Sequence, residues 1–456
     1  MFLDDPIVAI ATPPGSGGLA VLRVSGRGAL EVADRVFRPG RRDGPMPSLA
    51  PSHTVHQGLV MAGGRVVDEV LMTVLRGPRT YTREDTVEVG CHGGVVVARM
   101  VLEAFLAAGA RMAGPGEFTR RAFVNGRLDL AQAEAVADLI HARSERAVHA
   151  ATAQLSGALS RRIEALREAL MTVLAHLEAH LDFPDEDIAP ETGSALVSRV
   201  EAAMADARRL VESARNGRLL REGARVAIVG APNAGKSSLL NALLGVERAI
   251  VSDVPGTTRD TVEDLVTVAG YPVVLVDTAG MRESADAIER EGMRRSREAA
   301  MGADVVLEVA DVTLPPPTAV PVECGAGTAW LRVANKCDRQ ADPGFDGEAG
   351  WIRVSCRTGE GLDALRAAMG ASLGDGAARG GLGVGEEWAV SARHQDALRR
   401  SMEAMGLALG AMRSGLALDL VAADLRVAAQ AVGEVVGKTG TEDLLDRIFS
   451  TFCIGK

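Results

Sequence analysis

The pattern of apolar and polar residues changes twice along the chain. Residues 1 to about 120 contain short apolar runs separated by Gly- and Pro-rich turns, beginning with Ile7–Ala11 and Leu19–Val24. Two further runs of this kind, Val66–Leu75 and Thr86–Val89, precede one stretch with helical spacing. Strand-like runs mixed with a helix predict an α/β domain for this first part.

From about residue 121 the chain becomes rich in alanine and leucine. Leu128–Ile140 carries apolar residues at a spacing of about 3.6, and similar patterns fill 144–182 and 195–216. Patterns of this length predict long amphipathic helices that pack as a bundle.

Residues 220 to about 370 alternate strand-like and helical segments, which is typical of a parallel, doubly wound sheet covered by helices. A glycine-rich stretch at 374–385 predicts a flexible linker. After it, 388–413 and 417–450 return to the helical pattern. We therefore predict an α/β domain over 1–120, a helical domain over 121–219 and 374–456, and an α/β domain inserted over 220–373.

Composition limits the class of protein without changing this picture. The chain of 456 residues is 47% apolar and 24% charged, as globular proteins are. Its net charge of −10 means that any bound nucleic acid must be held by a local patch or by a partner. Five dispersed cysteines favour neither a disulfide framework nor a zinc site. Since no apolar run approaches the length of a membrane span, we expect a protein of the reducing cytoplasm.

The most informative motif lies at the start of the third region. Gly230–Ser237 fits the phosphate-binding pattern G-x-x-x-x-G-K-[ST], and it joins a strand-like run to a helical one. Such a loop points its backbone N–H groups at a phosphate, at a helix N-terminus that favours anions. Lys236 is predicted to neutralise the β- and γ-phosphates, and Ser237 to hold Mg²⁺.

Companion motifs identify the base. Asp277–Gly280 follows a strand-like run and suits the Mg²⁺ water shell and the γ-phosphate, while Thr257–Asp260 lies where a switch threonine is expected. The Asp338 carboxylate of Asn335–Asp338 can accept hydrogen bonds from the N1–H and exocyclic amine of guanine, and Ser355–Arg357 suits a third base contact. Adenine lacks this donor pair, so an ATPase would leave Asn335–Asp338 unexplained.

Further motifs extend beyond the nucleotide site. The chain resembles, over nearly its whole length, the family of bacterial tRNA-modification GTPases called MnmE or TrmE. The resemblance rests on Ala11-Thr-Pro-Pro-Gly15, Tyr81-Thr-Arg-Glu-Asp85, His92-Gly-Gly94, Pro115-Gly-Glu-Phe-Thr119, Arg121-Ala-Phe-Val-Asn125, Leu128-Asp-Leu-Ala-Gln-Ala-Glu134 and Cys453-Ile-Gly-Lys456. It implies a folate-binding-like N-terminal domain, a helical bundle and an inserted Ras-like P-loop GTPase domain.

The resemblance also implies the residues that hold GTP and its metal ions. Mg²⁺ would be bound by Ser237 and Thr258, and K⁺ by Asn233, Ser252, Val254 and Thr257. K⁺ would take the place of an arginine finger beside the phosphates. Ser252 stands where a threonine is common, and a main-chain carbonyl ligand tolerates that change. The full GTP-binding set is Asn233, Ala234, Gly235, Lys236, Ser237, Ser238, Ser252, Asp253, Val254, Pro255, Gly256, Thr257, Thr258, Asp277, Thr278, Ala279, Gly280, Asn335, Lys336, Asp338, Ser355, Cys356 and Arg357.

For hydrolysis, the residue after Asp277–Gly280 is Met281, which cannot orient a water as the glutamine of Ras-like domains does. The resemblance assigns that role to Glu289, acting through a bridging water. By pattern alone Glu289 is one charge of a solvated helix. Arg259 and Asp260 are expected to stabilise the closed switch.

The resemblance implies a second ligand, 5-formyltetrahydrofolate or a related tetrahydrofolate, bound by Arg23, Glu88, Arg127 and Lys456. A guanidinium suits the glutamate tail and a carboxylate suits the pterin edge. Arg127 replaces a lysine usual in the family, which keeps the charge and changes its geometry. Cys453 is either a nucleophilic thiol or an ordinary surface cysteine.

The resulting hypothesis is a K⁺-activated GTPase that acts on tRNA. In the family, a homodimer works with the flavin-dependent partner MnmG, as a heterotetramer, on C5 of the wobble uridine (U34), adding a carboxymethylaminomethyl or aminomethyl group. One alternative is a GTP-dependent switch in ribosome assembly that resembles Era or Der. Another is a folate enzyme that GTP merely regulates.

Overall fold

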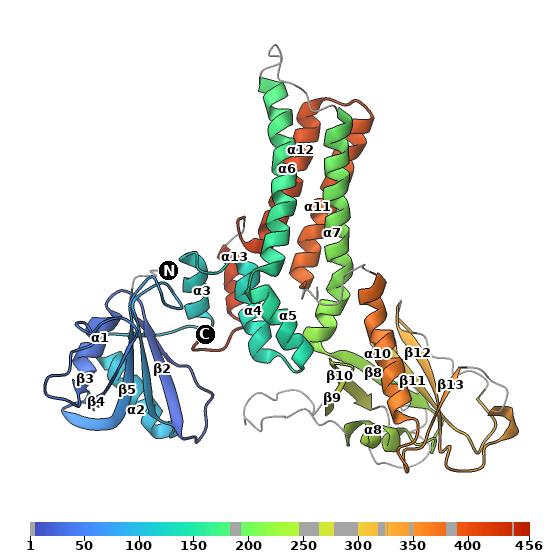
Figure 1. Ribbon diagram of the computed structural model, residues 1–456, viewed down its shortest axis with the longest axis horizontal. Helices are drawn as coiled ribbons and strands as arrows, with labels where there is room; N and C mark the ends of the chain where they lie inside the picture. Colours follow the sequence, from blue (N-terminus) through green and yellow to red (C-terminus); the bar gives the residue numbers. More distant parts are fainter. Residues whose placement is uncertain are drawn as a thin grey trace. The chain divides into compact units, whose positions relative to one another are not determined.

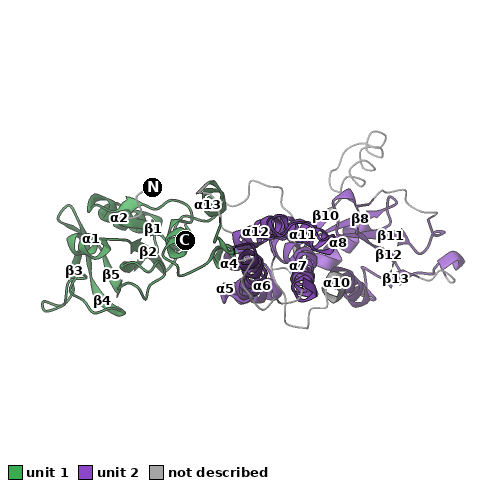
Figure 2. Cartoon of the chain, turned by 90° about the horizontal axis from the view of Figure 1, so that it is seen from above, with its two compact units in different colours: residues 1–137, 254–257, 436–456 green, residues 138–253, 258–435 purple. Residues whose placement is uncertain are grey.

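The computed structural model describes residues 5–182, 193–245, 264–277, 300–317, 324–325, 327–345, 350–379, 390–439 and 442–456. These residues form two compact units, coloured separately in Figure 2. The first holds the chain up to residue 137 together with 436–456. The second holds the described residues of 138–253 and 258–435.

The first unit is built on a seven-stranded sheet with the order β3-β4-β5-β6-β2-β1-β7. Neighbouring strands are antiparallel except β1 and β7, which are parallel. The strands are β1 Ile7–Ile10, β2 Leu19–Ser25, β3 Phe37–Pro39, β4 Thr54–Ala62, β5 Arg65–Leu75, β6 Thr86–His92 and β7 Arg111–Met112. The predicted α/β character is confirmed.

Two helices, α1 (Ala29–Val36) and α2 (Val95–Ala107), cover one face of this sheet. Their apolar side chains form a single buried cluster with alternate residues of the strands, including Leu22, Val87 and Phe105. Strand residues alternate between faces, so the opposite face carries other side chains. Leu19, 62% exposed, and Leu71, 53% exposed, belong to it.

The C-terminal segment returns to this first unit. Helix α13 (Glu442–Phe449) packs on α3 (Glu117–Val124), where the rings of Phe449 and Phe123 lie 6.4 Å apart. Arg120 bonds Asp446 at 2.6 Å, and Ile454 pairs with Pro115 as a β-bridge. The tail of the chain is thereby fixed beside residues of the N-terminal motifs.

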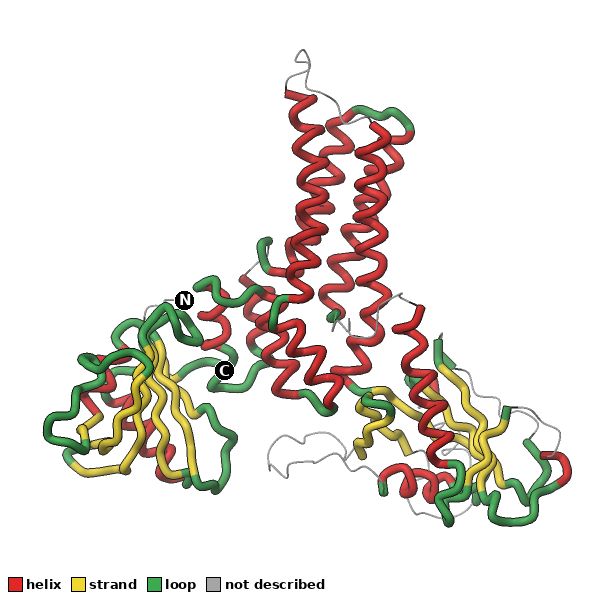
Figure 3. The backbone as a smooth tube through the Cα atoms, in the orientation of Figure 1, coloured by secondary structure: helices red, strands yellow, loops and turns green. Residues whose placement is uncertain are grey.

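The second unit contains a bundle of long helices, which run side by side in Figures 1 and 3. Helix α7 packs on α11, and Arg426 of α12 bonds Glu178 of α6 at 2.6 Å. Since α7 and α11 flank the α/β segment in sequence, that segment is inserted between two helices of one bundle, as predicted. The helices are α5 Glu145–Leu155, α6 Ala158–Asp182, α7 Gly193–Glu222, α11 Ala392–Arg413 and α12 Leu418–Val436, while α4 (Leu130–His141) spans the division between the units.

Two helical stretches are shorter than their sequence patterns. The predicted 144–182 pattern divides into α5 and α6 around Ser156 and Gly157, and the 417–450 pattern divides into α12 and α13. Periodicity alone does not reveal such breaks, because apolar spacing continues on both sides of them.

The inserted segment forms a six-stranded sheet with the order β13-β12-β11-β8-β10-β9. Its pairs are parallel except that of β9 with β10, which is an antiparallel hairpin. The elements are β8 Ala224–Gly230, α8 Lys236–Leu244, β9 Asp264–Val268, β10 Tyr271–Asp277, β11 Val305–Asp311, β12 Ala329–Asn335, the 3₁₀ turn Pro343–Phe345, β13 Trp351–Val354 and α10 Leu362–Arg379. The mostly parallel sheet is confirmed.

The flexible-linker prediction was wrong for part of its length. Helix α10 continues through residues 374–379, although Gly374 and Gly376 lower the helix propensity there. Residues 380–389 lie outside the described part of the chain. Among the described residues, no helix is long and apolar enough to cross a membrane.

A buried ionic cluster holds the N-terminal unit together. Arg121 is 1% exposed, and its guanidinium contacts Glu117 at 3.1 Å and Glu84 at 3.3 Å. Arg111 reaches the same Glu117 carboxylate at 2.7 Å. Burial raises the pKa of Glu117, but hydrogen bonds from Arg111, the Gly114 N–H and Arg121 outweigh it, so the pKa is lowered overall.

We predict that Glu117→Gln lowers the free energy of unfolding by about 3–5 kcal/mol at neutral pH, because it leaves buried guanidinium charge uncompensated. The lowered pKa makes this stabilisation present above the unfolded-state pKa and lost as the pH falls through the folded-state pKa. Denaturant unfolding as a function of pH measures both effects.

The matched control is Glu103→Gln, which removes an exposed carboxylate paired with Arg99 on α2. It should change the unfolding free energy by less than about 0.5 kcal/mol. A Glu117→Gln protein with the wild-type stability and acid dependence would contradict the prediction.

Candidate functional site

The predicted phosphate loop connects the end of β8 to the start of α8. Gly235 precedes α8 with φ +97°. A Cβ on this residue would lie 2.2 Å from Asn335 Nδ2. Only glycine combines that backbone conformation with so close an approach. The loop therefore exposes the N-terminus of α8 in the way an anion site requires.

Lys236 is the first residue of α8, and its side chain turns back over the loop. Its Nζ donates to the carbonyls of Gly230 at 3.0 Å and Ala231 at 2.9 Å. The ammonium group is thus held at the mouth of the loop. The prediction that it neutralises the β- and γ-phosphates is compatible with this position.

Asn335 ends β12 and is 2% exposed. Its Nδ2 donates to the carbonyl of Ala234 in the phosphate loop at 3.1 Å. Its Oδ1 accepts from the backbone N–H of Lys336 at 2.8 Å and from Cys356 Sγ at 3.2 Å. One buried amide therefore ties the phosphate loop to both segments predicted to hold the base.

Lys336 adds a second tie between these segments. Its Nζ donates to the carbonyl of Asn233 at 2.9 Å and to Asp311 Oδ2 at 2.5 Å. Burial raises the pKa of Asp311, but the Lys336 hydrogen bond and the bonds from Thr313 lower it overall, so the pair is ionised. The ammonium group of Lys336 is thereby anchored beside the phosphate loop.

Asp338 is the predicted guanine reader. Its Oδ1 accepts from Ser355 Oγ at 2.7 Å, and its Oδ2 lies 2.9 Å from Arg357 Nη2. The hydrogen bond from Ser355 lowers the pKa of Asp338, and the charge of Arg357 acts in the same direction. The carboxylate is therefore ionised and can accept from two neighbouring N–H donors.

Strand pairing explains why the two base-binding motifs meet. Asn335 is opposite Val354 in the parallel pair of β12 and β13. Beyond the strand ends, the Cys337 N–H still donates to the Val354 carbonyl at 3.1 Å. Motifs that follow parallel strands meet at the same edge of the sheet, so Ser355, Cys356 and Arg357 lie at the Asp338 loop.

The predicted metal ligands are described only in part. Asn233 and Ser237 both have exposed side chains on the loop and the first turn of α8, and their oxygens are hard donors that suit K⁺ and Mg²⁺. Ser238 follows in the same turn, also exposed. Asp277 ends β10 opposite Ile228 of β8, which brings its backbone beside the strand that leads into the loop.

Several predicted residues lie outside the described part of the chain. They are the potassium, magnesium, switch and catalytic candidates Ser252, Asp253, Val254, Pro255, Gly256, Thr257, Thr258, Arg259, Asp260, Thr278, Ala279, Gly280 and Glu289.

A second group of predicted residues comes together in the first unit. Arg23 of β2 is opposite Glu88 of β6, and its Nη2 and Nε donate to Glu88 Oε1 at 2.8 and 2.9 Å. The pKa of Lys456 responds to both side chains. Burial and the positive charge of Arg23 lower this pKa, whereas the negative charges of Glu88 and Cys453 raise it. The pKa of Lys456 is lowered overall. Residues from three distant parts of the sequence thus share one site.

The C-terminal tail reaches this site through one glycine. Gly455 has φ +101°, and a Cβ there would lie 2.6 Å from the carbonyl oxygen of Ile10. A side chain would push the tail away from β1. Cys453, whose side chain is exposed, is held by its carbonyl, which accepts from the Gly116 N–H at 3.4 Å.

Two aromatic residues of this site were not predicted to have a role. The Arg23 guanidinium lies 5.2 Å from the Tyr81 ring centroid and 5.8 Å from that of Phe118. The Arg127 guanidinium lies 4.8 Å from the Tyr81 ring centroid. Burial raises the pKa of Tyr81, so its hydroxyl stays neutral. The available signal was an aromatic residue within each polar motif, Tyr81-Thr-Arg-Glu-Asp85 and Pro115-Gly-Glu-Phe-Thr119.

The chain is similar to known protein families over nearly its whole length. A model described as the N-terminus of the GTP-binding protein TrmE matches residues 6–127, and a model described as the MnmE helical domain matches residues 130–453. The second match spans the inserted sheet, in agreement with the packing of α7 on α11.

Similar proteins cover the chain from end to end. One from Chloroflexus aurantiacus, named tRNA modification GTPase MnmE, is 47% identical over 100% of both chains. Another of that name from Symbiobacterium thermophilum is 47% identical over 99% of this chain and 100% of its own. Among solved structures, the G domain of the T. maritima FeoB iron transporter is 23% identical with a TM-score of 0.22, covering 34% of this chain and 98% of its own.

We predict that Asp338→Asn changes the preferred base from guanine to xanthine. The Asp338 carboxylate can accept a hydrogen bond from the guanine 2-amino group, whereas an asparagine amide can donate one to the xanthine 2-oxo group. GTP affinity should fall by roughly 10²-fold or more, and the affinity for xanthosine triphosphate should rise correspondingly. Titration with both nucleotides measures the exchange.

Asp363→Asn serves as its control, since the Asp363 side chain is fully exposed and pairs only locally with Arg366. It should leave both affinities unchanged. If Asp338→Asn lowered the affinity for both nucleotides equally, Asp338 would stabilise the loop and would not determine which base is bound.

Proposed function

The chain belongs to the MnmE (TrmE) family of tRNA modification GTPases, and from this premise we propose that it couples GTP hydrolysis to modification of the wobble uridine of tRNA with a folate-borne one-carbon unit. One observation carries the proposal: a guanine pocket around Asp338 and a separate cluster of Arg23, Glu88 and Lys456 occur in the same chain. The first is a site for GTP and the second for a ligand with both carboxylates and a hydrogen-bonding ring.

The second site matches the chemistry of a tetrahydrofolate. Glu88 offers a carboxylate to the amino-pyrimidine edge of a pterin, and Arg23 and Arg127 offer guanidinium groups to a glutamate tail. Tyr81 and Phe118 supply flat apolar surfaces beside Arg23. The tail places Lys456 next to this cluster and Cys453 three residues before it, where both are available to the one-carbon group.

Potassium activation is proposed for the first site. Asn233 sits in the left-handed region, at φ +61°, with an exposed side chain on the phosphate loop. Its amide oxygen would join Ser252, Val254 and Thr257 as K⁺ ligands, and the ion would supply positive charge beside the β- and γ-phosphates. Mg²⁺ would be held by Ser237 and Thr258, and Glu289 would orient the attacking water with support from Arg259 and Asp260.

The proposed assembly is a homodimer through the N-terminal domains that acts with a flavin-dependent MnmG partner on tRNA. Leu19, Val55 and Leu71 are more than half exposed on three strands of the sheet, on the face opposite α1 and α2. An exposed apolar face of this kind is suited to pairing with a second copy. A ribosome-assembly switch of the Era or Der type would leave the Arg23–Glu88 site without a purpose.

The proposal is tested by nucleoside analysis of tRNA from a strain that lacks this protein. The C5 modification of the wobble uridine should disappear, and the wild-type chain should restore it. Glu88→Gln should fail to restore it, because an amide cannot accept both pterin donors. Glu69→Gln on the neighbouring strand β5, whose side chain is exposed and bonds Gln57, should restore it fully. Unchanged wobble uridines in the deletion strain would overturn the proposal.

The proposed role of K⁺ in hydrolysis is tested by measuring the rate of GTP turnover in K⁺ and in Na⁺. We expect about tenfold or faster turnover in K⁺, because a cage of carbonyl oxygens distinguishes the two ions. Asn233→Ala should lose most of this stimulation while it still binds GDP. Asn241→Ala, an exposed asparagine of α8 in the next turns, should keep it. Equal rates in both salts would remove the ion from the mechanism.

A further inference from the structure

The β9–β10 hairpin connects the nucleotide site with the helical domain. Its β10 strand ends at Asp277, where the predicted γ-phosphate motif begins, and β9 begins at Asp264, four residues after the predicted switch segment ends at Asp260. At the other end of the hairpin lies the turn from Val268 to Tyr271. The hairpin therefore extends from the nucleotide-facing end of the sheet to this turn.

The turn is held by helices that come before the sheet in the sequence. Tyr271 is fully buried, and its hydroxyl donates to Asn216 Oδ1 of α7 at 2.7 Å. The guanidinium of Arg146, from α5, lies over the same ring, 4.2 Å from its centroid. Asn216 itself is 5% exposed. One aromatic side chain of the sheet therefore has a directional contact with each of two helices.

The apolar packing around this contact is continuous. Ala147 and Ala150 of α5 and Leu219 of α7 belong to the same buried cluster as Val268 and Tyr271 of the hairpin. Packed cores rearrange between discrete arrangements and do not deform gradually. A shift of the hairpin must therefore be accompanied by a shift of α5 and of the end of α7.

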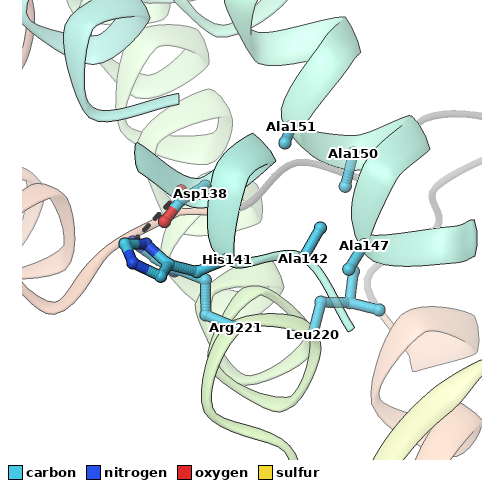
Figure 4. Close-up of a pocket in the computed structure, with 8 residues that line it drawn as sticks. All are labelled: Asp138, His141, Ala142, Ala147, Ala150, Ala151, Leu220 and Arg221. Atoms are coloured by element: carbon cyan, nitrogen blue, oxygen red, sulfur yellow. Dashed lines mark ion pairs between the residues drawn. The ribbon is translucent and has the colours of Figure 1, made fainter. Parts of the chain in front are cut away.

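Helix α5 borders a space that side chains do not fill. A cavity of about 200 Å³ lies between α4, α5 and α7, and Figure 4 shows its lining. Alanines of α5, with Ala142 and Leu220, form most of its wall, and Arg221 lies 3.7 Å from Asp138 at its polar side. A well-filled junction would resist a displacement of α5 more strongly than this one.

We propose that Arg146, Asn216 and Tyr271 are positioning residues that transmit the nucleotide state from the β9–β10 hairpin to α5 and α7. This inference rests on the proposed coupling of GTP hydrolysis to tRNA modification. It adds which residues carry the coupling. The hydrogen bond and the cation–π contact of Tyr271 have defined geometries, so a shift of the hairpin makes or breaks them.

The direct test is hydrogen exchange of the full-length protein bound to GDP or to a non-hydrolysable GTP analogue with K⁺ and Mg²⁺. In the wild type, backbone amides of residues 145–155 and 210–222 should exchange at rates that differ several-fold between the two nucleotides. Equal exchange of both segments in the two states would overturn the inference. This outcome does not depend on tRNA, so it is distinct from failure of the proposed function.

Variants then separate coupling from stability. Tyr271→Phe keeps the ring and removes the bond to Asn216, and Arg146→Met removes the charge above the ring. Both should keep GTP hydrolysis within about threefold of wild type while tRNA modification falls about tenfold or more. The nucleotide-dependent difference in exchange should also be lost. Arg146→Lys, which retains a cation over the ring, should recover most of the modification.

Arg332→Met is the matched control. Arg332 of β12, next to the edge strand β13, lies 5.6 Å from the Trp351 ring centroid and 3.5 Å from Glu308 Oε2. Its removal should leave the exchange difference and the modification unchanged. The inference would be overturned if Tyr271→Phe and Arg146→Met both retained tRNA modification and the nucleotide-dependent difference in hydrogen exchange. So would a loss of the same size in Arg332→Met, because the effect would then be one of general stability.

Discussion

The packing of α7 on α11 is the constraint on which the rest of the second unit depends. The chain leaves the bundle at Glu222, builds the six-stranded sheet and returns at Ala392 to the same pair of helices. Both ends of the sheet domain are thereby attached to one frame. Leu219 and Leu220, at the end of α7, are buried in the core of the sheet itself. A helix that belongs to two cores cannot move in one of them alone.

The return of the chain also makes the second site possible. After α12, residues 436–456 belong to the N-terminal unit, and α13 packs on α3 through Phe449 and Phe123. This packing brings the tail to β1, which pairs with the strand that carries Arg23. One topology therefore explains both the inserted domain and the second site. In this topology, helices near the C-terminus pack against helices that precede the inserted sheet in the sequence.

Each site depends on buried polar groups whose partners are far away in the sequence. The Asn335 amide joins the phosphate loop to the base-binding loops, and the Asp338 carboxylate is oriented by Ser355. In the N-terminal unit, Arg121 and Glu117 compensate one another where either alone would be costly. Such groups give the sites fixed geometry, because a buried polar atom has few alternatives to its hydrogen-bond partner. The Tyr271 contact follows the same logic at the junction of sheet and helices.

The sequence by itself determined the features that short segments encode. Gly230–Ser237 defines its loop by the glycine and lysine spacing, Asp338 defines the base by its donor and acceptor pattern, and apolar periodicity predicted the bundle and the mostly parallel sheet. The folate-type residues were inferred from motifs and not from spacing, since nothing near Arg23 in sequence distinguishes it from a surface charge.

Only the tertiary structure decided which of these segments meet. The register of β12 and β13 places Ser355 at Asp338, the path of α13 places Lys456 beside Arg23, and the hairpin turn places Tyr271 between α5 and α7. Periodicity also did not predict the division of residues 144–182 into two helices or the helical part of the glycine-rich stretch. The physical reason is that propensity and periodicity act over a few residues, whereas register, helix breaks and side-chain partners are set by the packing of the whole core.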